Sequence, residues 1–139
     1  MNTRSAVAGI ACVALAVPAI ALAAVPQFEG KAGTAVVSIE TKGSGDNIAR
    51  VKSFSWDGLK CGGDKFTGGT SKSIKVKGGA FKSTQPVGGV EVALKLVLKG
   101  KFTAHGTKAR GTLKIKGACH TGKVKWSAKL APQQGQQQG

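Results

Sequence analysis

The stretch VEVALKLVLK, residues 90–99, gives the clearest indication of how this chain folds. Apolar side chains occupy every second position of it: Val90, Val92, Leu94, Leu96 and Leu98. Charged side chains fall on the other face: Glu91, Lys95 and Lys99. Because successive side chains of a β-strand point to opposite faces, this alternation predicts a long strand with one buried face and one face in water.

The same period of two recurs on both sides of this stretch. Outside that stretch, the alternation predicts these inward residues: Ala35, Val37, Ile39, Ile74, Val76, Phe102, Ala104, Gly111, Leu113, Ile115, Val124, Trp126 and Ala128. Three further phenylalanines, Phe54, Phe66 and Phe81, are also interpreted as packing residues. We therefore expect several short strands that share one apolar core.

Glycine-rich and Asx-rich segments separate these strands. Residues 43–47 and 105–108 are predicted to be turns, because glycine, Asn and Asp accept the backbone angles that reverse a chain. Residues 60–70 are predicted to be a loop, and Asp57-Gly58 fits either a two-residue hairpin turn or a β-bulge. With no convincing helical periodicity, the sequence predicts an all-β fold. The expected architecture is an antiparallel β-sandwich of about 7–9 strands, with a small closed β-barrel as the alternative.

The N-terminus has the features of an export signal. Arg4 precedes an apolar run, residues 6–24, that contains no charged side chain and is broken by Pro18. Ala21-Leu22-Ala23 provides the small-x-small pattern of a cleavage site. A membrane anchor is the alternative, but a spanning helix needs about 20 uninterrupted apolar residues. We predict a signal peptide at residues 1–23, and a secreted, periplasmic or cell-envelope protein without a transmembrane segment after cleavage.

The rest of the chain is predicted to contain one domain, residues 24–131, and a tail, residues 132–139. The tail after Pro132 contains only Gln and Gly, which bury too little apolar surface to order a chain, so we expect disorder there. Cys12 lies within the signal peptide and would be lost with it. An even number of cysteines in an exported chain indicates disulfide pairing, so we predict one bridge between Cys61 and Cys119.

The charge of the chain is strongly positive, with 21 Lys and Arg residues against 6 Asp and Glu residues. Many lysines fall at predicted outward strand positions, and the candidate binding residues are Lys95, Lys99, Lys114, Lys116, Lys123, Lys125 and Lys129. Such a face is either a solvated surface that keeps the protein soluble or a site for polyanions. Anionic polysaccharide, teichoic acid and lipopolysaccharide are the candidate partners. Sequence-specific nucleic-acid recognition is not expected, since arginines and stacking aromatic residues are scarce.

Two other function classes remain open at this point. Trp56 lies next to a predicted turn, where its ring could be presented to a neutral glycan. A passive structural or protein-interaction domain needs no special residues. The sequence does not predict an oligomeric state.

Enzymatic activity is not expected. The chain contains no nucleophile elbow, zinc-protease, P-loop or dinucleotide motif. Cys119 and His120 are adjacent, but neighbouring strand residues point to opposite faces and cannot share a proton. Asp57 and Asp64 could be considered as a glycosidase pair, but their positions beside glycine are explained more simply by turns. The cysteine and histidine spacings fit no zinc site, so neither a metal nor a cofactor is expected.

The C-terminal half also resembles a group of small secreted bacterial β-sandwich domains. The resemblance is carried by Gly100-Lys101-Phe102, by Gly111-Thr112-Leu113, and by residues 119–128, CHTGKVKWSA. These segments fit the group's pattern of G-x-F, then G-T-L, then C-x-x-G-x-V-x-W-x-A. Phe28-Glu29-Gly30 and Cys61 lie where that group has its opening strand and its first cysteine. The resemblance implies the fold and the disulfide, and it implies no activity.

Overall fold

The computed structural model describes residues 26–132. The predicted signal peptide and the predicted tail beyond Pro132 lie outside the described residues. The elements of the described part are β1 (Gln27–Ala32), β2 (Ala35–Lys42), η2 (Gly45–Asn47), β3 (Arg50–Cys61), β4 (Asp64–Thr70), β5 (Ile74–Lys75), β6 (Ala80–Gly88), β7 (Leu94–Thr103), β8 (Lys108–Gly117) and β9 (Val124–Leu130). Element η2 is a single turn of 3-10 helix.

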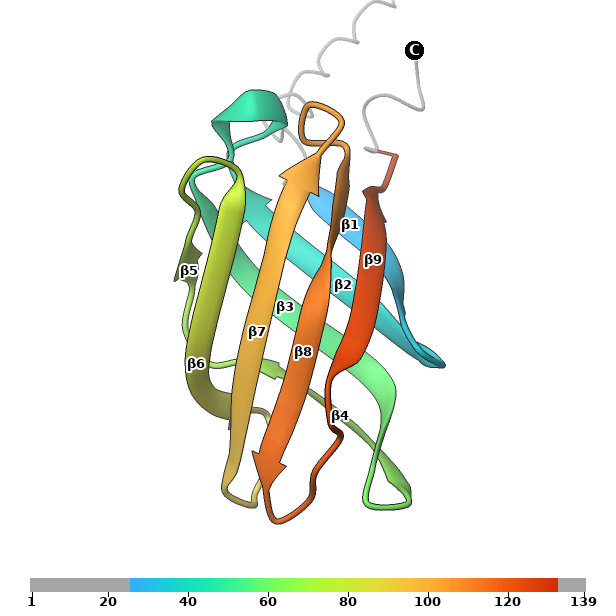
Figure 1. Cartoon of the computed structure of the whole chain (residues 1–139). Helices are drawn as coiled ribbons and strands as arrows, with labels where there is room; N and C mark the ends of the chain where they lie inside the picture. The colour runs from blue at the N-terminus through green and yellow to red at the C-terminus, as the bar shows by residue number, and fades with distance from the viewer. Residues whose placement is uncertain (1–25, 133–139) are drawn as a thin grey trace, which may run out of the picture. The chain divides into compact units, whose positions relative to one another are not determined.

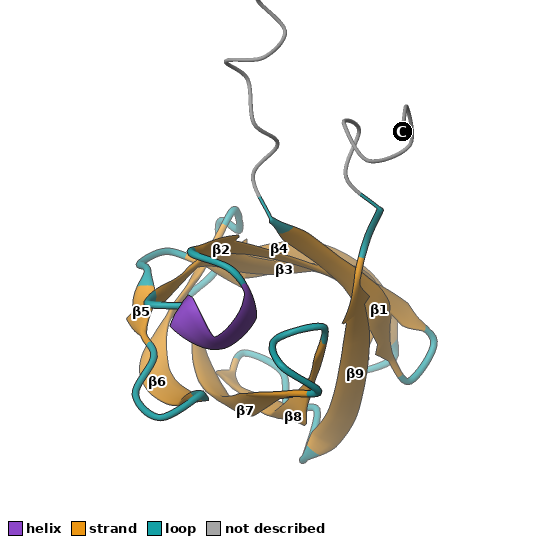
Figure 2. Cartoon of the chain, turned by 90° about the horizontal axis from the view of Figure 1, so that it is seen from above, coloured by secondary structure: helices purple, strands orange, loops and turns teal. Residues whose placement is uncertain are grey.

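The strands form one antiparallel sheet that closes on itself (Figures 1 and 2). Its order is β2-β1-β9-β8-β7-β6-β4-β3, and β2 also pairs with β3, which completes the ring. Short strand β5 pairs with the first residues of β3 and lies outside this ring. The all-β prediction is confirmed, and of the two architectures that the sequence left open, the closed barrel is the one present.

The barrel closes least completely between β4 and β6. Their backbone pairing is limited to Gly69 with Gly88 and Thr70 with Val87. Next to these pairs the buried side chain of Gln85 replaces a longer ladder. Its Oε1 accepts hydrogen bonds from the backbone N–H groups of Ser71 and Lys72 at 2.7 and 2.9 Å, and its Nε2 donates to the Lys72 carbonyl at 3.2 Å. The buried Gln85 amide, whose oxygen and nitrogen both form hydrogen bonds, therefore holds β6 against the residues that follow β4.

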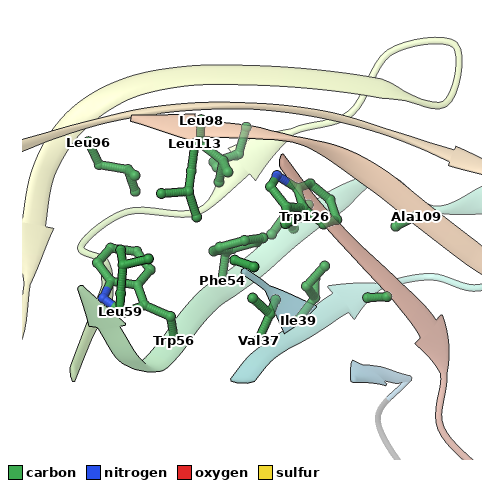
Figure 3. Close-up of a cluster of buried hydrophobic side chains, with 14 of the residues drawn as sticks. Val37, Ile39, Phe54, Trp56, Leu59, Leu96, Leu98, Ala109, Leu113 and Trp126 are labelled. Carbon is green, nitrogen blue, oxygen red and sulfur yellow. The ribbon is translucent and has the colours of Figure 1, made fainter. Parts of the chain in front are cut away.

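The interior is filled by apolar side chains from all sides of the barrel (Figure 3). Leu96, Leu98 and Leu113 come from β7 and β8, and they face Val37, Ile39, Phe54 and Trp56 from β2 and β3. The Trp126 ring of β9 packs against Phe54 with 5.0 Å between ring centroids. These residues lie at alternating strand positions, as the period of two predicts.

Glycine lets the strands of β7 and β8 lie directly on these rings. Gly100 and Gly111 are opposite each other, and Gly111 is opposite Trp126, so the three form one row across the sheet. A Cβ atom on Gly100 would lie 2.5 Å from ring carbons of both Phe81 and Trp126. A larger residue at position 100 would therefore force the wall away from the core.

Three local predictions differ in the structure, and one open alternative is resolved. Ala104, predicted to be inward, is exposed in the turn between β7 and β8. Strand β7 begins at Leu94, so the prediction that the strand includes Val90 and Val92 is wrong. Val90 is half-buried and packs against the core, whereas Val92 is 54% exposed. Residues 89–93 have to carry the chain from β6 back into β7, and the pairing of β7 with β8 starts only at Leu94.

The predicted loop over residues 60–70 is also wrong, because β4 begins directly after a turn at Gly62-Gly63. Its glycines indicate close packing, since a Cβ on Gly69 would lie 2.7 Å from the Phe54 carbonyl oxygen. At Asp57-Gly58 the alternatives resolve to a bulge, because β3 continues through these residues with a shift in its pairing to β4.

The predicted disulfide is confirmed. Cys61, the last residue of β3, is bonded to Cys119 in the β8–β9 connection, with 5.6 Å between their Cα atoms. The bridge therefore joins two segments that are 58 residues apart in sequence. Within residues 26–132 no helix has the length and apolar character needed to cross a membrane.

Candidate functional site

The outer surface of the barrel is divided by charge. Strands β6, β7, β8 and β9 contain no Asp or Glu, and we call their outer surface the cationic wall. Its exposed cations are Lys82, Lys95, Lys99, Lys101, Lys108, Arg110, Lys114, Lys116, Lys125 and Lys129. Strands β2, β3 and β4 lie across the barrel from β7 and β8 (Figure 2) and form the opposite wall. That wall mixes both signs, with Glu40, Asp57 and Asp64 among its lysines.

Several cations of the cationic wall lie directly opposite one another. The paired positions are Lys82 with Lys99, Lys95 with Lys116, Lys101 with Arg110, and Lys108 with Lys129. Like charges directly opposite on neighbouring strands are destabilising. Among the described residues, the one ion pair within 4.0 Å is Asp46 with His105, which lies in the turn between β7 and β8 and not on a strand of the wall. The strands of the wall therefore offer these cations no carboxylate to offset their repulsion, and at its border Glu29 of β1 lies opposite Lys129.

The seven lysines predicted as a binding face are all exposed, and six of them lie on the strands of this wall. The seventh, Lys123, directly precedes β9. Four other cations of this wall were not predicted as binding residues: Lys82, Lys101, Lys108 and Arg110. Lys31 of the neighbouring strand β1 was not predicted either. Lys101 could have been predicted from the sequence, because it lies two residues after Lys99 and therefore on the same face of β7. Gly100 between them does not interrupt the alternation.

A shallow, open transverse groove of about 830 Å³ crosses the cationic wall. Its floor is the row of Gly100, Gly111 and Trp126, whose side-chain positions face inward. The first rim, which we call the Thr112 rim, consists of Lys99, Thr112 and Lys125. The second, the Ser127 rim, consists of Lys101, Arg110, Ser127 and Lys31 of β1. The groove is therefore lined by five cations and two hydroxyl groups, and by no carboxylate.

Two further hollows continue the groove. One, of about 800 Å³, shares Lys31, Arg110 and Ser127 with it and extends to Lys108 and Lys129. This second hollow includes one acid, Glu29 of β1. A third, of about 490 Å³, shares Lys99 and Gly100 with the groove and extends to Lys75, Lys77 and Lys82. The cationic wall thus carries a connected set of shallow, positively charged hollows.

The residues that motivated other functions have structural roles. Trp56 is 2% exposed and packs inside the barrel against Phe66, so it does not present a ring to a glycan. The sulfur of Cys119 is bonded to Cys61, which leaves no thiol beside His120. Asp57 accepts a hydrogen bond of 2.6 Å from the Thr67 hydroxyl across the β3–β4 hairpin. Among the described residues, no cluster of three or more His, Cys, Asp or Glu side chains comes together.

Comparisons with known proteins give no match: neither a protein-family model, nor a curated protein, nor a solved structure is significantly similar to this chain.

Proposed function

We propose that this protein is a secreted or cell-envelope domain without enzymatic activity that binds polyanions through its cationic wall. The observation that carries the proposal is the acid-free surface of β6–β9, where many cations and few acids line a connected set of hollows. Low-dielectric walls lined by one sign of charge concentrate ligands of the opposite sign. Anionic polysaccharide, teichoic acid and lipopolysaccharide are ligands of this kind at a cell surface.

The main alternative is a lysine surface that serves only solubility. Solubility requires net charge and no particular arrangement, and interspersed signs satisfy it well. Here the six acids of the chain all lie outside β6–β9, so the cations that face one another across that wall have no acid on the same strands. The opposite wall also has opposed cations, Lys42 with Arg50 and Lys60 with Lys65, but its strands carry acids as well. A ligand whose negative charges lie between the lysines of the cationic wall would remove the repulsion that the arrangement causes. This placement therefore favours a ligand-binding surface.

Retention on immobilised dextran sulfate, with neutral dextran as the uncharged reference, tests the proposal. We expect retention on the sulfated matrix alone. The logarithm of the association constant should fall linearly with the logarithm of salt concentration, because binding releases counterions. A variant with Lys99, Lys101, Lys114 and Lys125 replaced by Gln should bind at least about tenfold more weakly, with a salt slope reduced by up to about 3.

The matched control removes the same number of charges from the opposite wall. Lys42, Lys52, Lys60 and Lys65 are all exposed there, and their replacement by Gln gives the same net charge as the first variant. We expect this control to bind within about threefold of the parent, since its lost charges lie outside the contact surface. Equal loss in both variants would indicate attraction by net charge alone. That result, or absence of salt-sensitive binding by the parent, would overturn the proposal.

A further inference from the structure

We propose that the transverse groove is a binding site for a linear acidic polysaccharide that carries its acid groups on alternate sugar rings. The inference rests on the proposed function and specifies its ligand. It depends on three features of the groove: the direction in which it runs, the spacing of its cations, and the hydroxyl groups between them.

The groove runs across the strands. Each of β7, β8 and β9 contributes only three consecutive residues to it, at positions 99–101, 110–112 and 125–127. In the other direction the groove passes over all three strands and reaches Lys31 of β1 and Gly33 beyond it. A polymer in the groove would therefore lie perpendicular to the strands, between the two rims.

On each rim a hydroxyl residue lies between two cations, and on the Ser127 rim a third cation, Lys101, lies directly opposite Arg110. On the Thr112 rim, Thr112 lies directly between Lys99 and Lys125. On the Ser127 rim, Ser127 lies directly between Arg110 and Lys31. Neighbouring strands are about 4.8 Å apart, so cations two strands apart are separated by roughly 10 Å at the backbone. That distance is close to the length of a disaccharide unit in an extended chain.

The chemistry between the cations suits an uncharged sugar ring. Thr112 and Ser127 both donate and accept hydrogen bonds, as sugar hydroxyls do. The floor is formed at Gly100 and Gly111, where the absence of outward side chains leaves room for a ring. A ligand with acids on alternate rings would place each acid beside a cation and each neutral ring beside a hydroxyl residue.

Single-stranded nucleic acid fits this groove less well. Sequence-tolerant recognition of single strands depends on aromatic side chains on which bases stack. The one aromatic residue of the groove is Trp126, and its ring points into the barrel and is 3% exposed. The groove therefore lacks a stacking platform.

The test compares three probes: a hyaluronan oligosaccharide with a carboxylate on every second ring, an oligogalacturonate with the same number of carboxylates on every ring, and a single-stranded oligonucleotide. We expect the parent to bind hyaluronan most tightly at equal salt. The double variant Thr112→Val/Ser127→Ala should lose about tenfold in affinity for hyaluronan, through two lost hydrogen bonds. Its affinity for oligogalacturonate should stay within about twofold, and its salt slope should not change, because no charge is removed.

The control variant Ser38→Ala/Ser55→Ala removes two hydroxyls that lie opposite each other on the opposite wall, and it should bind all probes as the parent does. If the parent binds polyanions with a steep salt dependence but without preferring hyaluronan, the inference is wrong and the proposed function stands. The same conclusion follows if the Thr112→Val/Ser127→Ala variant binds hyaluronan as tightly as the parent does. If the parent binds none of the charged probes, the proposed function and the inference both fail.

Discussion

The cationic wall and the opposite wall enclose one apolar interior, yet their outer surfaces differ. Inward residues on both walls follow the same alternation, and each wall contributes one buried tryptophan, Trp126 on β9 and Trp56 on β3. The outward positions of β6–β9 carry cations without acids, whereas β2–β4 mix the two signs. Packing therefore constrains the inward positions of both walls and leaves the outward positions free to differ. The charge difference calls for an explanation outside the fold.

If the walls are equivalent inside, removing either tryptophan should have a similar and large effect. Trp126 packs against Phe54 and Phe81, and Trp56 packs against Phe54 and Phe66. We expect Trp126→Ala and Trp56→Ala each to lower the free energy of unfolding by about 3–5 kcal/mol, through lost burial and a residual cavity. Urea denaturation followed by circular dichroism measures both.

The comparison would be wrong if the two variants differed strongly. A loss below about 1 kcal/mol for Trp126→Ala, beside a large loss for Trp56→Ala, would mean that the cationic wall packs poorly on the shared core. Trp126→Phe provides the conservative control. It keeps most of the ring and removes an indole N–H that is buried without a hydrogen-bond partner. Its loss should therefore be smaller than that of the alanine variant.

The disulfide joins the two walls covalently. Cys61 ends β3 of the opposite wall, and Cys119 lies in the connection that leads into β9 of the cationic wall. For a separation of 58 residues, the chain-entropy model gives a stabilisation of about 4 kcal/mol. We expect Cys61→Ala/Cys119→Ala to lower the free energy of unfolding by about 2–4 kcal/mol in urea denaturation. An unchanged urea midpoint, or two alkylatable thiols in the unreduced parent after denaturation, would contradict this.

The sequence predicted the class of fold and most inward residues because a strand buried on one side leaves a period of two. The closed barrel could not be chosen over a sandwich, because that choice depends on which strands pair at a distance. Here it rests on short β4–β6 pairing between Gly69-Thr70 and Val87-Gly88. Both segments contain glycine, and glycine in a sequence is typical of loops. Alternation also cannot locate the start of β7. Val90 and Val92 continue the apolar alternation of the strand, although backbone pairing with β8 begins only at Leu94.

The candidate site was predictable in part for the same reason. Strand parity places Lys95, Lys99, Lys114 and Lys116 outward without knowledge of the fold. The alternation of side chains along one strand does not show which outward residues of different strands are neighbours. The groove therefore appears only once the pairing brings Lys31 of β1 beside Ser127 of β9, nearly a hundred positions further along the chain.

The smallest expected effect concerns the repulsion within the cationic wall. Lys95 and Lys116 lie directly opposite each other on β7 and β8, whereas at the border of the wall Glu29 of β1 lies opposite Lys129 of β9. Double-mutant cycles with Gln should give couplings of opposite sign, each about 0.2–0.5 kcal/mol: repulsive for the lysine pair and attractive for the glutamate–lysine pair. Because these side chains are exposed, both couplings should shrink as salt is raised from low concentration to about 1 M, where the screening length falls to about 3 Å. Chemical denaturation in urea, which adds no ions, measures the four free energies of each cycle. A lysine pair with no coupling at low salt would mean that its charges are already neutralised in water. The repulsion that a bound polyanion is proposed to relieve would then be absent, and the contrast between the two walls would lose its energetic consequence.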